Sequence, residues 1–334
     1  MTTHTRCNRL TTHGPRRKLP TLSLLFAAAL SVALVTLPPG ASAANTWHVS
    51  PNSAGACTVA DPNCATIQAA VTAASSGDTI QVAAGSYAEH VTISKDLTIN
   101  GAGAAQTVVD GMQSGTVFFI ISGTVSLSGM TVTNGDTSLY GGGINNSGVL
   151  TVINCVISNN SASNGGGIIN TKTATITNSV VSGNFTTDSS GAGGGVFNST
   201  GTLNVSGSTF SNNSINKSIN SSGLGGGICN ANQSTLNVNG STFDNNLAGF
   251  GGGIYNTNAT MTVTGSTFGN NSARYGGGIY NGQTATVTSS TFSGNSGGGS
   301  NSGGGGGIDN NGPLTITSSI VAGNTTATSG PDLR

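Results

Sequence analysis

Very few side chains in this sequence could support acid–base or metal chemistry. Between residues 111 and 324 the only acidic residues are four aspartates, at positions 136, 188, 244 and 309. Enzymes that cleave polysaccharides use two or three clustered carboxylates, which bind calcium or act as acid and base. Asp136 and Asp188, with Lys217 after them, come nearest to this requirement, whereas we expect Asp244 and Asp309 to lie on solvated surface. Catalysis by Asp136, Asp188 and Lys217 is therefore kept only as an alternative.

Other side chains suit binding better than catalysis. Tyr255 and Tyr280 stand 25 residues apart at the same place of a repeated glycine-rich motif, so we expect their rings to stack and to contact a ligand. His48 and His90 lack metal-ligand spacing, and we expect neither a metal nor a cofactor. A further alternative is binding to ice or to another crystal surface through a flat array of hydroxyl groups. The pattern Thr-x-Thr recurs at Thr175/Thr177, Thr262/Thr264, Thr286/Thr288 and Thr315/Thr317. The array is interrupted at Asn204, Ser206, Asn237 and Asn239, and threonine is in any case a favoured strand residue.

The elements that must position these residues follow from an internal repeat. The motif Gly-Gly-Gly-Ile-x-Asn, with Val for Ile once, occurs seven times. A period between 20 and 50 residues is typical of solenoids, in which each repeat forms one coil. The motif asparagines are Asn146, Asn170, Asn198, Asn230, Asn256, Asn281 and Asn310.

A block of eleven residues follows each motif and never varies in length. Its apolar residues alternate as in Leu203 and Val205, and a larger one follows, as at Phe210, so they predict strands with these side chains inward. The sequence therefore predicts an all-β, right-handed parallel β-helix with three strands per coil. Asparagine closes the corners, where it tolerates left-handed backbone and its amide can bond to the next coil. The block asparagines are Asn160, Asn184, Asn213, Asn246, Asn271, Asn295 and Asn324.

The connections between these segments vary most on one edge, since those that follow each motif have only 3 to 5 residues. From the end of a block to the next triglycine they have 4, 8, 11, 4, 4 and 9 residues. Insertions on one edge of a solenoid often mark its binding face. If the protein binds a ligand, we expect the binding site to lie along this edge.

The first 43 residues are expected to be an export signal that is cleaved after Ala43. Five of the ten basic residues precede an uncharged apolar run between Pro20 and Pro38, which is short for a membrane span. All ten acidic residues follow, so the chain from residue 44 has five basic and ten acidic residues, a net charge of about −5. This charge argues against nucleic acid as a partner. We expect a secreted protein without a transmembrane segment, possible attachment to a cell surface or outer membrane being left open.

Residues 44–110 are expected to form a cap and less regular coils before the regular repeats of 111–334. Apolar residues at helical spacing predict a short helix over Thr66–Ala74 that covers the end of the core. Cys57 and Cys64 lie close together in an exported chain, which favours a disulfide between them. Cys155 and Cys229 would lie about 14 Å apart, too far to bridge.

Two resemblances accompany these patterns. The segments Thr66–Val71, Gly77–Ile80, Gly85–Tyr87 and Leu97–Gly101 resemble the start of pectin lyase-like β-helix proteins, some of which act on pectin. The Gly-Gly-Gly-Ile units, paired with Phe-x-x-Asn over residues 141–324, are similar to the repeats of chlamydial polymorphic outer membrane proteins. We expect the chain to lack the carboxy-terminal transporter barrel of that second family.

These observations favour a non-enzymatic surface or adhesion protein. Its partner would be an extracellular polysaccharide or a surface protein. A lyase or hydrolase acting on pectin-like substrates and an ice- or crystal-binding protein remain the alternatives.

Overall fold

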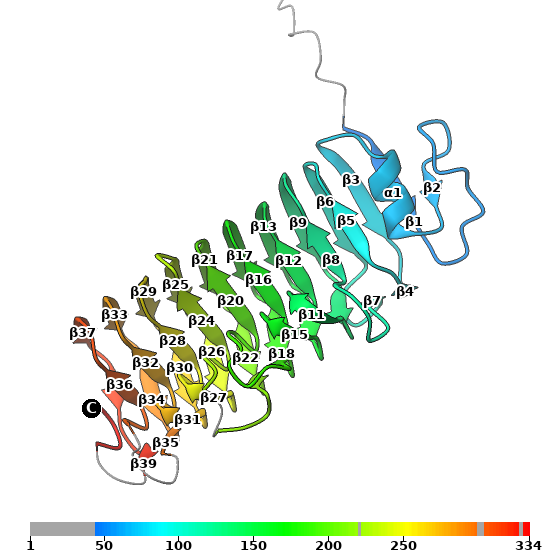
Figure 1. The fold of residues 1–334 in the computed structure, drawn as a ribbon. Helices are drawn as coiled ribbons and strands as arrows, with labels where there is room; N and C mark the ends of the chain where they lie inside the picture. The colour runs from blue at the N-terminus through cyan, green and yellow to red at the C-terminus, as the bar shows by residue number, and fades with distance from the viewer. Residues whose placement is uncertain (1–43, 220–221, 299–303, 327–329) are drawn as a thin grey trace, which may run out of the picture. The chain divides into compact units, whose positions relative to one another are not determined.

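A computed structural model describes residues 44–219, 222–298, 304–326 and 330–334. These residues form a parallel β-helix with one short helix, and successive coils stack from the amino-terminal cap to the carboxy-terminal coil (Figure 1). The predicted fold class is confirmed. The expected signal segment, residues 1–43, lies outside the described residues.

Four parallel sheets run along the solenoid. Sheet A has twelve strands and carries the Leu-x-Val segments: β1 (Thr46–Val49), β2 (Asn63–Cys64), β3 (Asp78–Val82), β6 (Leu97–Gly101), β9 (Thr124–Ser128), β13 (Val149–Ile153), β17 (Thr173–Thr177), β21 (Thr202–Ser206), β25 (Thr235–Asn239), β29 (Thr260–Thr264), β33 (Ala285–Thr288) and β37 (Leu314–Thr317). Sheet B has ten strands and carries the Ser-Thr-Phe segments: β4 (Gly85–Ala88), β7 (Thr107–Asp110), β10 (Thr131–Thr133), β14 (Val156–Ser158), β18 (Val180–Ser182), β22 (Thr209–Ser211), β26 (Thr242–Asp244), β30 (Thr267–Gly269), β34 (Thr291–Ser293) and β38 (Ile320–Val321).

Sheet C has nine strands and carries the Gly-Ile-x-Asn segments: β5 (Val91–Ile93), β8 (Phe118–Ile120), β12 (Ile144–Asn146), β16 (Ile168–Asn170), β20 (Val196–Ser199), β24 (Ile228–Ala231), β28 (Ile254–Asn256), β32 (Ile279–Asn281) and β36 (Ile308–Asn310). The three expected segments of a coil are therefore all strands. Sheet D adds a fourth short strand to each regular coil, in the variable connection before the triglycine: β11 (Asp136–Tyr140), β15 (Ser161–Asn164), β19 (Phe185–Thr186), β23 (Ser214–Ile215), β27 (Leu247–Phe250), β31 (Ser272–Tyr275), β35 (Ser296–Gly297) and β39 (Thr325–Thr326).

The core consists of columns of like side chains stacked along the axis. Phe210, Phe243, Phe268 and Phe292 are fully buried, and their ring centroids lie 4.9, 4.7 and 4.5 Å apart. Burial of the four or five apolar side chains of one coil contributes roughly 1.5 to 3 kcal/mol each. The conformational entropy lost when the backbone of about 25 residues becomes ordered opposes this gain. Only stacking covers both faces of each apolar layer, so stability depends on neighbouring coils.

Two ladders of buried asparagine amides run parallel to the core. In the motif ladder the Nδ2 of Asn146 donates to the Oδ1 of Asn170 at 2.7 Å, and the same bond repeats through Asn310. The block ladder runs from Asn160 to Asn324, whose amide donates to the Oδ1 of Asp332 at 3.0 Å. Inside the solenoid, each side-chain amide thus provides the hydrogen bonds that water would otherwise form with its neighbours.

The left-handed backbone does not fall on these asparagines, contrary to expectation. At the block ladder positive φ occurs one residue earlier, as at Asn159 (57°), Asn212 (56°) and Asn245 (54°), whereas at the motif ladder it occurs two residues later in some coils, as at Thr200 and Asn258. A ladder side chain must point inward to reach its neighbours. The preceding residue therefore makes the bend, and its own short side chain faces outward.

Each glycine of the triglycine has its own steric reason. At Gly251 the backbone is left-handed, with φ +64°, and an added Cβ would lie 2.3 Å from the carbonyl oxygen of Ile254. At Gly252 a Cβ would meet the backbone of Gly277 and Ser272 in the next coil, and at Gly253 it would lie 2.9 Å from the Phe268 ring. The triglycine therefore lets the corner between sheets D and C close tightly against the core.

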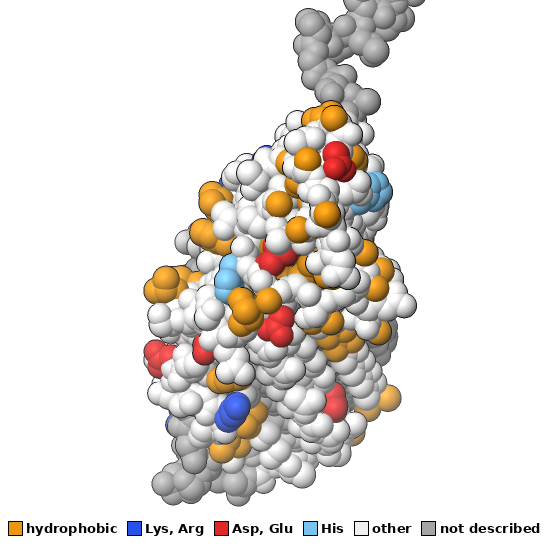
Figure 2. All heavy atoms as spheres, turned by 90° about the vertical axis from the view of Figure 1, so that its right-hand side faces the viewer, with side chains coloured by type: hydrophobic (Ala, Val, Ile, Leu, Met, Phe, Trp, Pro, Cys, Tyr) orange, Lys and Arg blue, Asp and Glu red, His pale blue; other side chains and the backbone are white. Residues whose placement is uncertain are grey.

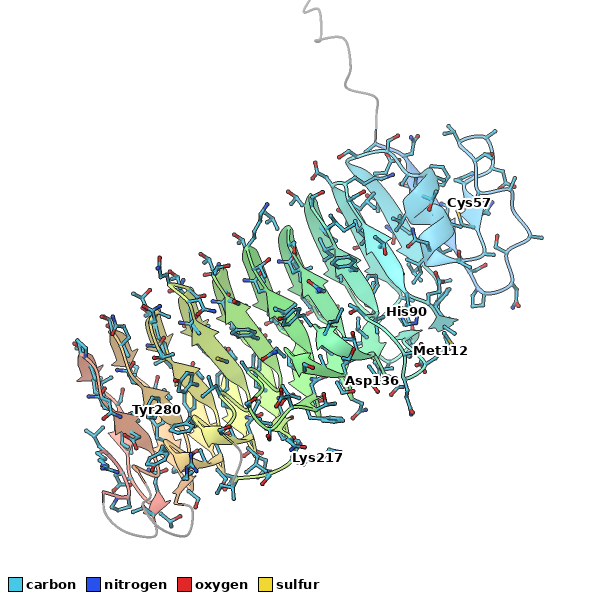
Figure 3. All side chains as sticks on the ribbon, in the orientation of Figure 1. Cys57, His90, Met112, Asp136, Lys217 and Tyr280 are labelled. Atoms are coloured by element: carbon cyan, nitrogen blue, oxygen red, sulfur yellow. A yellow bond between two sulfur atoms is a disulfide. The ribbon has the colours of Figure 1, made fainter. Side chains whose placement is uncertain are left out.

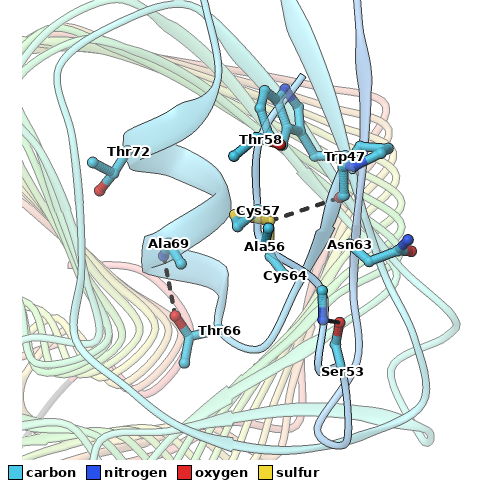
Figure 4. Close-up of a disulfide and its surroundings, with 12 residues drawn as sticks. Trp47, Ser53, Ala56, Cys57, Thr58, Asn63, Cys64, Thr66, Ala69 and Thr72 are labelled. Atoms are coloured by element: carbon cyan, nitrogen blue, oxygen red, sulfur yellow. Dashed lines mark hydrogen bonds between the residues drawn. A yellow bond between two sulfur atoms is a disulfide. The ribbon is translucent and has the colours of Figure 1, made fainter. Parts of the chain in front are cut away.

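The amino-terminal end is covered as predicted. Helix α1 (Ile67–Ala73) begins after Thr66, whose hydroxyl accepts a hydrogen bond from the Ala69 amide, and it buries Ile67, Ala70 and Val71. Cys57 and Cys64 form the expected disulfide beside it (Figure 4). No helix among the described residues is long and apolar enough to cross a membrane.

Candidate functional site: an aromatic cleft between sheets D and C

The corner at which sheet D passes into sheet C brings two outward columns together. One column is the residue before each triglycine, and the other is the variable residue between Ile and Asn of the motif. In the later coils these positions hold Phe250 with Tyr255 and Tyr275 with Tyr280, and the second column continues at Asp309. Parallel register therefore places four rings at one corner, where Figure 3 labels Tyr280.

The four rings form a compact cluster. Tyr255 stacks on Tyr280 with centroids 5.1 Å apart, as expected from the repeat, and Phe250 stacks on Tyr275 at 5.0 Å. Phe250 also meets the edge of Tyr280 at 5.5 Å. The Arg274 guanidinium lies 5.1 Å from the Phe250 centroid, within cation–π range. The rings thus fix one another in position.

An open cleft of about 290 Å³ lies at the end of the tyrosine stack. Phe250, Tyr275 and Tyr280 supply its apolar wall, and Arg274 and Asp309 are among its polar residues. We call it the aromatic cleft. Because Asp309 follows Tyr280 in the column and has no ring, the stack ends here.

Asp309 is buried, so the expectation that it lies on solvated surface is wrong. Its side chain is 2% exposed, its Oδ1 accepts a hydrogen bond from the Asn311 amide at 3.2 Å, and its Oδ2 has no hydrogen-bond partner. Burial raises the pKa of Asp309, against the opposing effects of Arg334, the Asn311 side chain and the Gly305 backbone amide. The Nε of Arg274 is likewise buried without a hydrogen-bond partner. The cleft therefore holds two polar groups whose bonding capacity is not filled.

The residues of the enzyme alternative are each engaged separately. Asp136 begins β11, and its Oδ1 accepts a hydrogen bond from the Ser161 hydroxyl at 2.8 Å. Asp188 lies in the loop after β19, where the amide and hydroxyl of Ser190 bind its carboxylate and lower its pKa. The Nζ of Lys217 lies 4.3 Å from the Phe185 ring centroid. Figure 3 shows Asp136 and Lys217 on one edge, at different coils.

The expected threonine array is present as neighbouring columns on sheet A. Thr262, Thr286 and Thr315 are in register, and the residues two places on form a second column. The asparagine-bearing strands β21 and β25 precede them, and a hollow of about 290 Å³ opens there. The array is therefore unbroken only over β29, β33 and β37, and Thr262 and Thr264 of β29 also line the hollow.

Metal ligands do not gather in the described part of the chain. No group of three or more His, Cys, Asp or Glu side chains there could hold a metal ion. Charged side chains are few and scattered over the face that carries the cap (Figure 2). Cys155 and Cys229 are buried thiols, and burial raises the pKa of Cys155 to about 11.

Sequence reasoning found Tyr255 and Tyr280 but missed Phe250, Tyr275, Arg274 and Asp309. The available signal was the residue before each triglycine, which is apolar in several coils. Comparison of that column with the variable residue between Ile and Asn of the motif would have predicted that apolar side chains gather on the outside of this corner.

Comparison with known proteins shows the architecture only. No protein-family model and no curated protein matches this sequence. Among solved structures, the chain is similar to pectate lyase Pel9A, at 15% identity and a TM-score of 0.53, over 88% of this chain and 79% of that chain. The fold is a pectate lyase-like β-helix. Pectin methylesterase PemA from Erwinia chrysanthemi (12% identity, TM-score 0.42, 86% and 92% covered) and pectin methylesterase from carrot (11%, 0.40, 88% and 89%) also match.

Proposed function

We propose that this protein is an extracellular, non-enzymatic β-helix that binds a polysaccharide at the aromatic cleft. The observation that carries the proposal is the meeting, in one cleft, of a terminal tyrosine ring with a buried carboxylate and a guanidinium. A sugar offers an apolar C–H face surrounded by hydroxyl groups. Binding sites of this kind combine aromatic walls with a few polar groups that fix the ligand's orientation.

Asp309 supports a functional cleft because it is costly to the fold. A buried carboxylate with one oxygen unpaired, and a raised pKa, destabilises the folded state. An amide or apolar side chain at this position would avoid that cost. Groups with such perturbed pKa values concentrate at functional sites.

Binding is favoured over catalysis by the arrangement of the carboxylates. Acid–base cleavage of a glycosidic bond uses two carboxyl groups on either side of the bond. Asp309 is the one carboxylate side chain among the described residues that line the aromatic cleft. Asp136 and Asp188 are each held by a neighbouring serine instead. The pectin-cleaving alternative would need a different site.

A panel of immobilised plant and microbial polysaccharides tests this proposal on the mature chain. Wild type is expected to bind at least one polysaccharide, and Tyr280→Ala should weaken that binding about tenfold, because the terminal ring loses its contact area. Tyr140→Ala is the matched control, since Tyr140 is also a tyrosine on this corner but lies in an early coil and outside the aromatic cleft.

Two results would overturn the proposal. One is binding that Tyr280→Ala leaves unchanged. The other is turnover of polygalacturonate, with or without calcium, that Asp136→Ala or Asp188→Ala abolishes, because that result would establish the enzyme alternative.

A further inference from the structure

Sheet D begins later than the other three sheets and leaves a strand edge open. Sheets A, B and C all have strands in the amino-terminal coils, and helix α1 packs on strands of sheets A and C. The first strand of sheet D is β11, which pairs with β15 on its carboxy-terminal side. On its other side the described residues provide one bridge, in which the Asp136 amide donates to the Gly115 carbonyl at 3.0 Å.

The open edge of β11 presents backbone groups and apolar side chains together. The Asp136 amide faces this edge, and the Ser138 amide faces it too because the register with β15 is regular as far as Thr137. The Ser138 carbonyl instead turns back to β15 and accepts a hydrogen bond from the Ser163 hydroxyl at 2.7 Å. The register with β15 shifts between Thr137 and Tyr140, and the side chains of Ser138, Leu139 and Tyr140 are all exposed. Leu139 is 66% exposed and Tyr140 50% exposed.

A groove of about 330 Å³ lies along this edge, and we call it the edge groove. Thr137, Leu139 and Tyr140 of β11, Phe119 of sheet C and Gly115 are among the residues that line it. Phe119 is 40% exposed. In Figure 3 the neighbouring residues His90, Met112 and Asp136 lie along this part of the solenoid. Clustered exposed apolar side chains beside an unpaired strand edge are typical of a protein-binding site.

The chemistry of the groove selects a peptide as its occupant. Unpaired backbone groups are satisfied by another backbone, and the apolar walls by an apolar side chain. Asp136 begins β11, next to the lining residue Thr137, and the sequence has no Lys or Arg between Lys95 and Lys172. A cationic residue in the ligand would therefore find the Asp136 carboxylate without competition from a Lys or Arg near it in the sequence.

We propose that the edge groove binds an extended peptide segment of a partner protein. The segment adds to β11 as an outer strand of sheet D and places an apolar side chain between Leu139 and Phe119, with a Lys or Arg near Asp136. This site lies on coils other than those of the aromatic cleft and does not depend on the proposed polysaccharide binding.

Selection of random displayed peptides on the full mature chain tests this inference. We expect enriched peptides with alternating apolar residues and at least one cation. A synthetic copy of the most enriched peptide should lose about tenfold or more in affinity for Ser138→Pro and for Leu139→Ser. Proline is tolerated on an edge strand where the lost amide faces outward, so the bonds to β15 should survive.

Val180→Ser is the matched control, because Val180 is an exposed apolar strand residue of sheet B (37% exposed) outside the groove. It should bind the peptide like wild type. If Ser138→Pro fails to fold by thermal melting, Leu139→Ser decides the result. The inference is wrong if no peptide is enriched, or if the enriched peptide binds both variants as it binds wild type. Self-association of wild type that Leu139→Ser abolishes would also overturn it, because the occupant would then be a second copy.

Discussion

Removing one amide from the block ladder should destabilise the whole solenoid. Asn246 is 1% exposed. Its Oδ1 accepts from the backbone amide of Asn213 at 3.1 Å and from that residue's Nδ2 at 3.0 Å. Its Nδ2 donates to the Phe210 carbonyl and to the Oδ1 of Asn271, both at 2.9 Å. In Asn246→Ala all four bonds are lost.

The magnitude follows from which partners are left unsatisfied. The backbone amide of Asn213 would be buried without an acceptor, which costs about 1 to 3 kcal/mol. The other three partners lose one bond each at about 0.5 to 1.5 kcal/mol, although the Nδ2 of Asn213 keeps its bond to the Val181 carbonyl. We therefore expect Asn246→Ala to lower the free energy of unfolding by about 4 kcal/mol.

Urea unfolding followed by far-ultraviolet circular dichroism measures this change. Asn239→Ala is the control, because Asn239 lies nearby on sheet A with its side chain exposed, and it should change stability by less than about 0.5 kcal/mol. An effect of Asn246→Ala no larger than that of Asn239→Ala, at equal denaturant slope, would refute the view that the ladder stabilises the fold.

Three further substitutions give distinct signatures in thermal melting. Gly251→Ala should lower the melting temperature clearly more than Gly240→Ala. Both glycines have positive φ, which alone destabilises an alanine by roughly 1 to 2 kcal/mol. Only at Gly251 would the added Cβ also meet backbone atoms, because nothing lies within 4 Å of it at Gly240. Equal losses would contradict the steric account. Burial alone would raise the pKa of Asp78, but the hydrogen bonds that its carboxylate accepts outweigh burial and lower the pKa. Asp78→Asn should therefore lower the melting temperature at neutral pH. This loss should shrink as pH falls below about 4, where the carboxylate becomes protonated. The pKa of Asp309 is raised, so Asp309→Asn should raise the melting temperature at neutral pH, and this gain should vanish as pH falls towards about 4. A gain for Asp309→Asn that persists in acid would mean that ionisation is not the cause.

The sequence predicted the coils because their inward residues are constrained at every repeat. A column such as Phe210 to Phe292 must keep its size and apolar character, and the asparagine ladders must keep an amide, so both patterns are visible without a structure. The fourth strand was not predicted, because the strands of sheet D have two to five residues and lie in connections that vary in length.

The candidate site was harder to predict because it depends on single substitutions in otherwise variable columns. Tyr255 and Tyr280 could be paired from their spacing, but the burial of Asp309 follows from its contacts at the corner and not from its own column. The edge of β11 is open because the earlier described coils have no strand of sheet D. The glycine repeat begins in the coil of β11, so its pattern cannot reveal what the earlier coils lack.

The most direct test of the account is a crystal structure of residues 44–334 with an oligosaccharide of the polysaccharide that the protein binds best. We predict a sugar ring on the exposed side of Tyr280, with its hydroxyl groups within hydrogen-bond distance of Asp309 or Arg274. A sugar bound at Asp136 and Asp188, or on the threonine face of sheet A, would contradict the central claim.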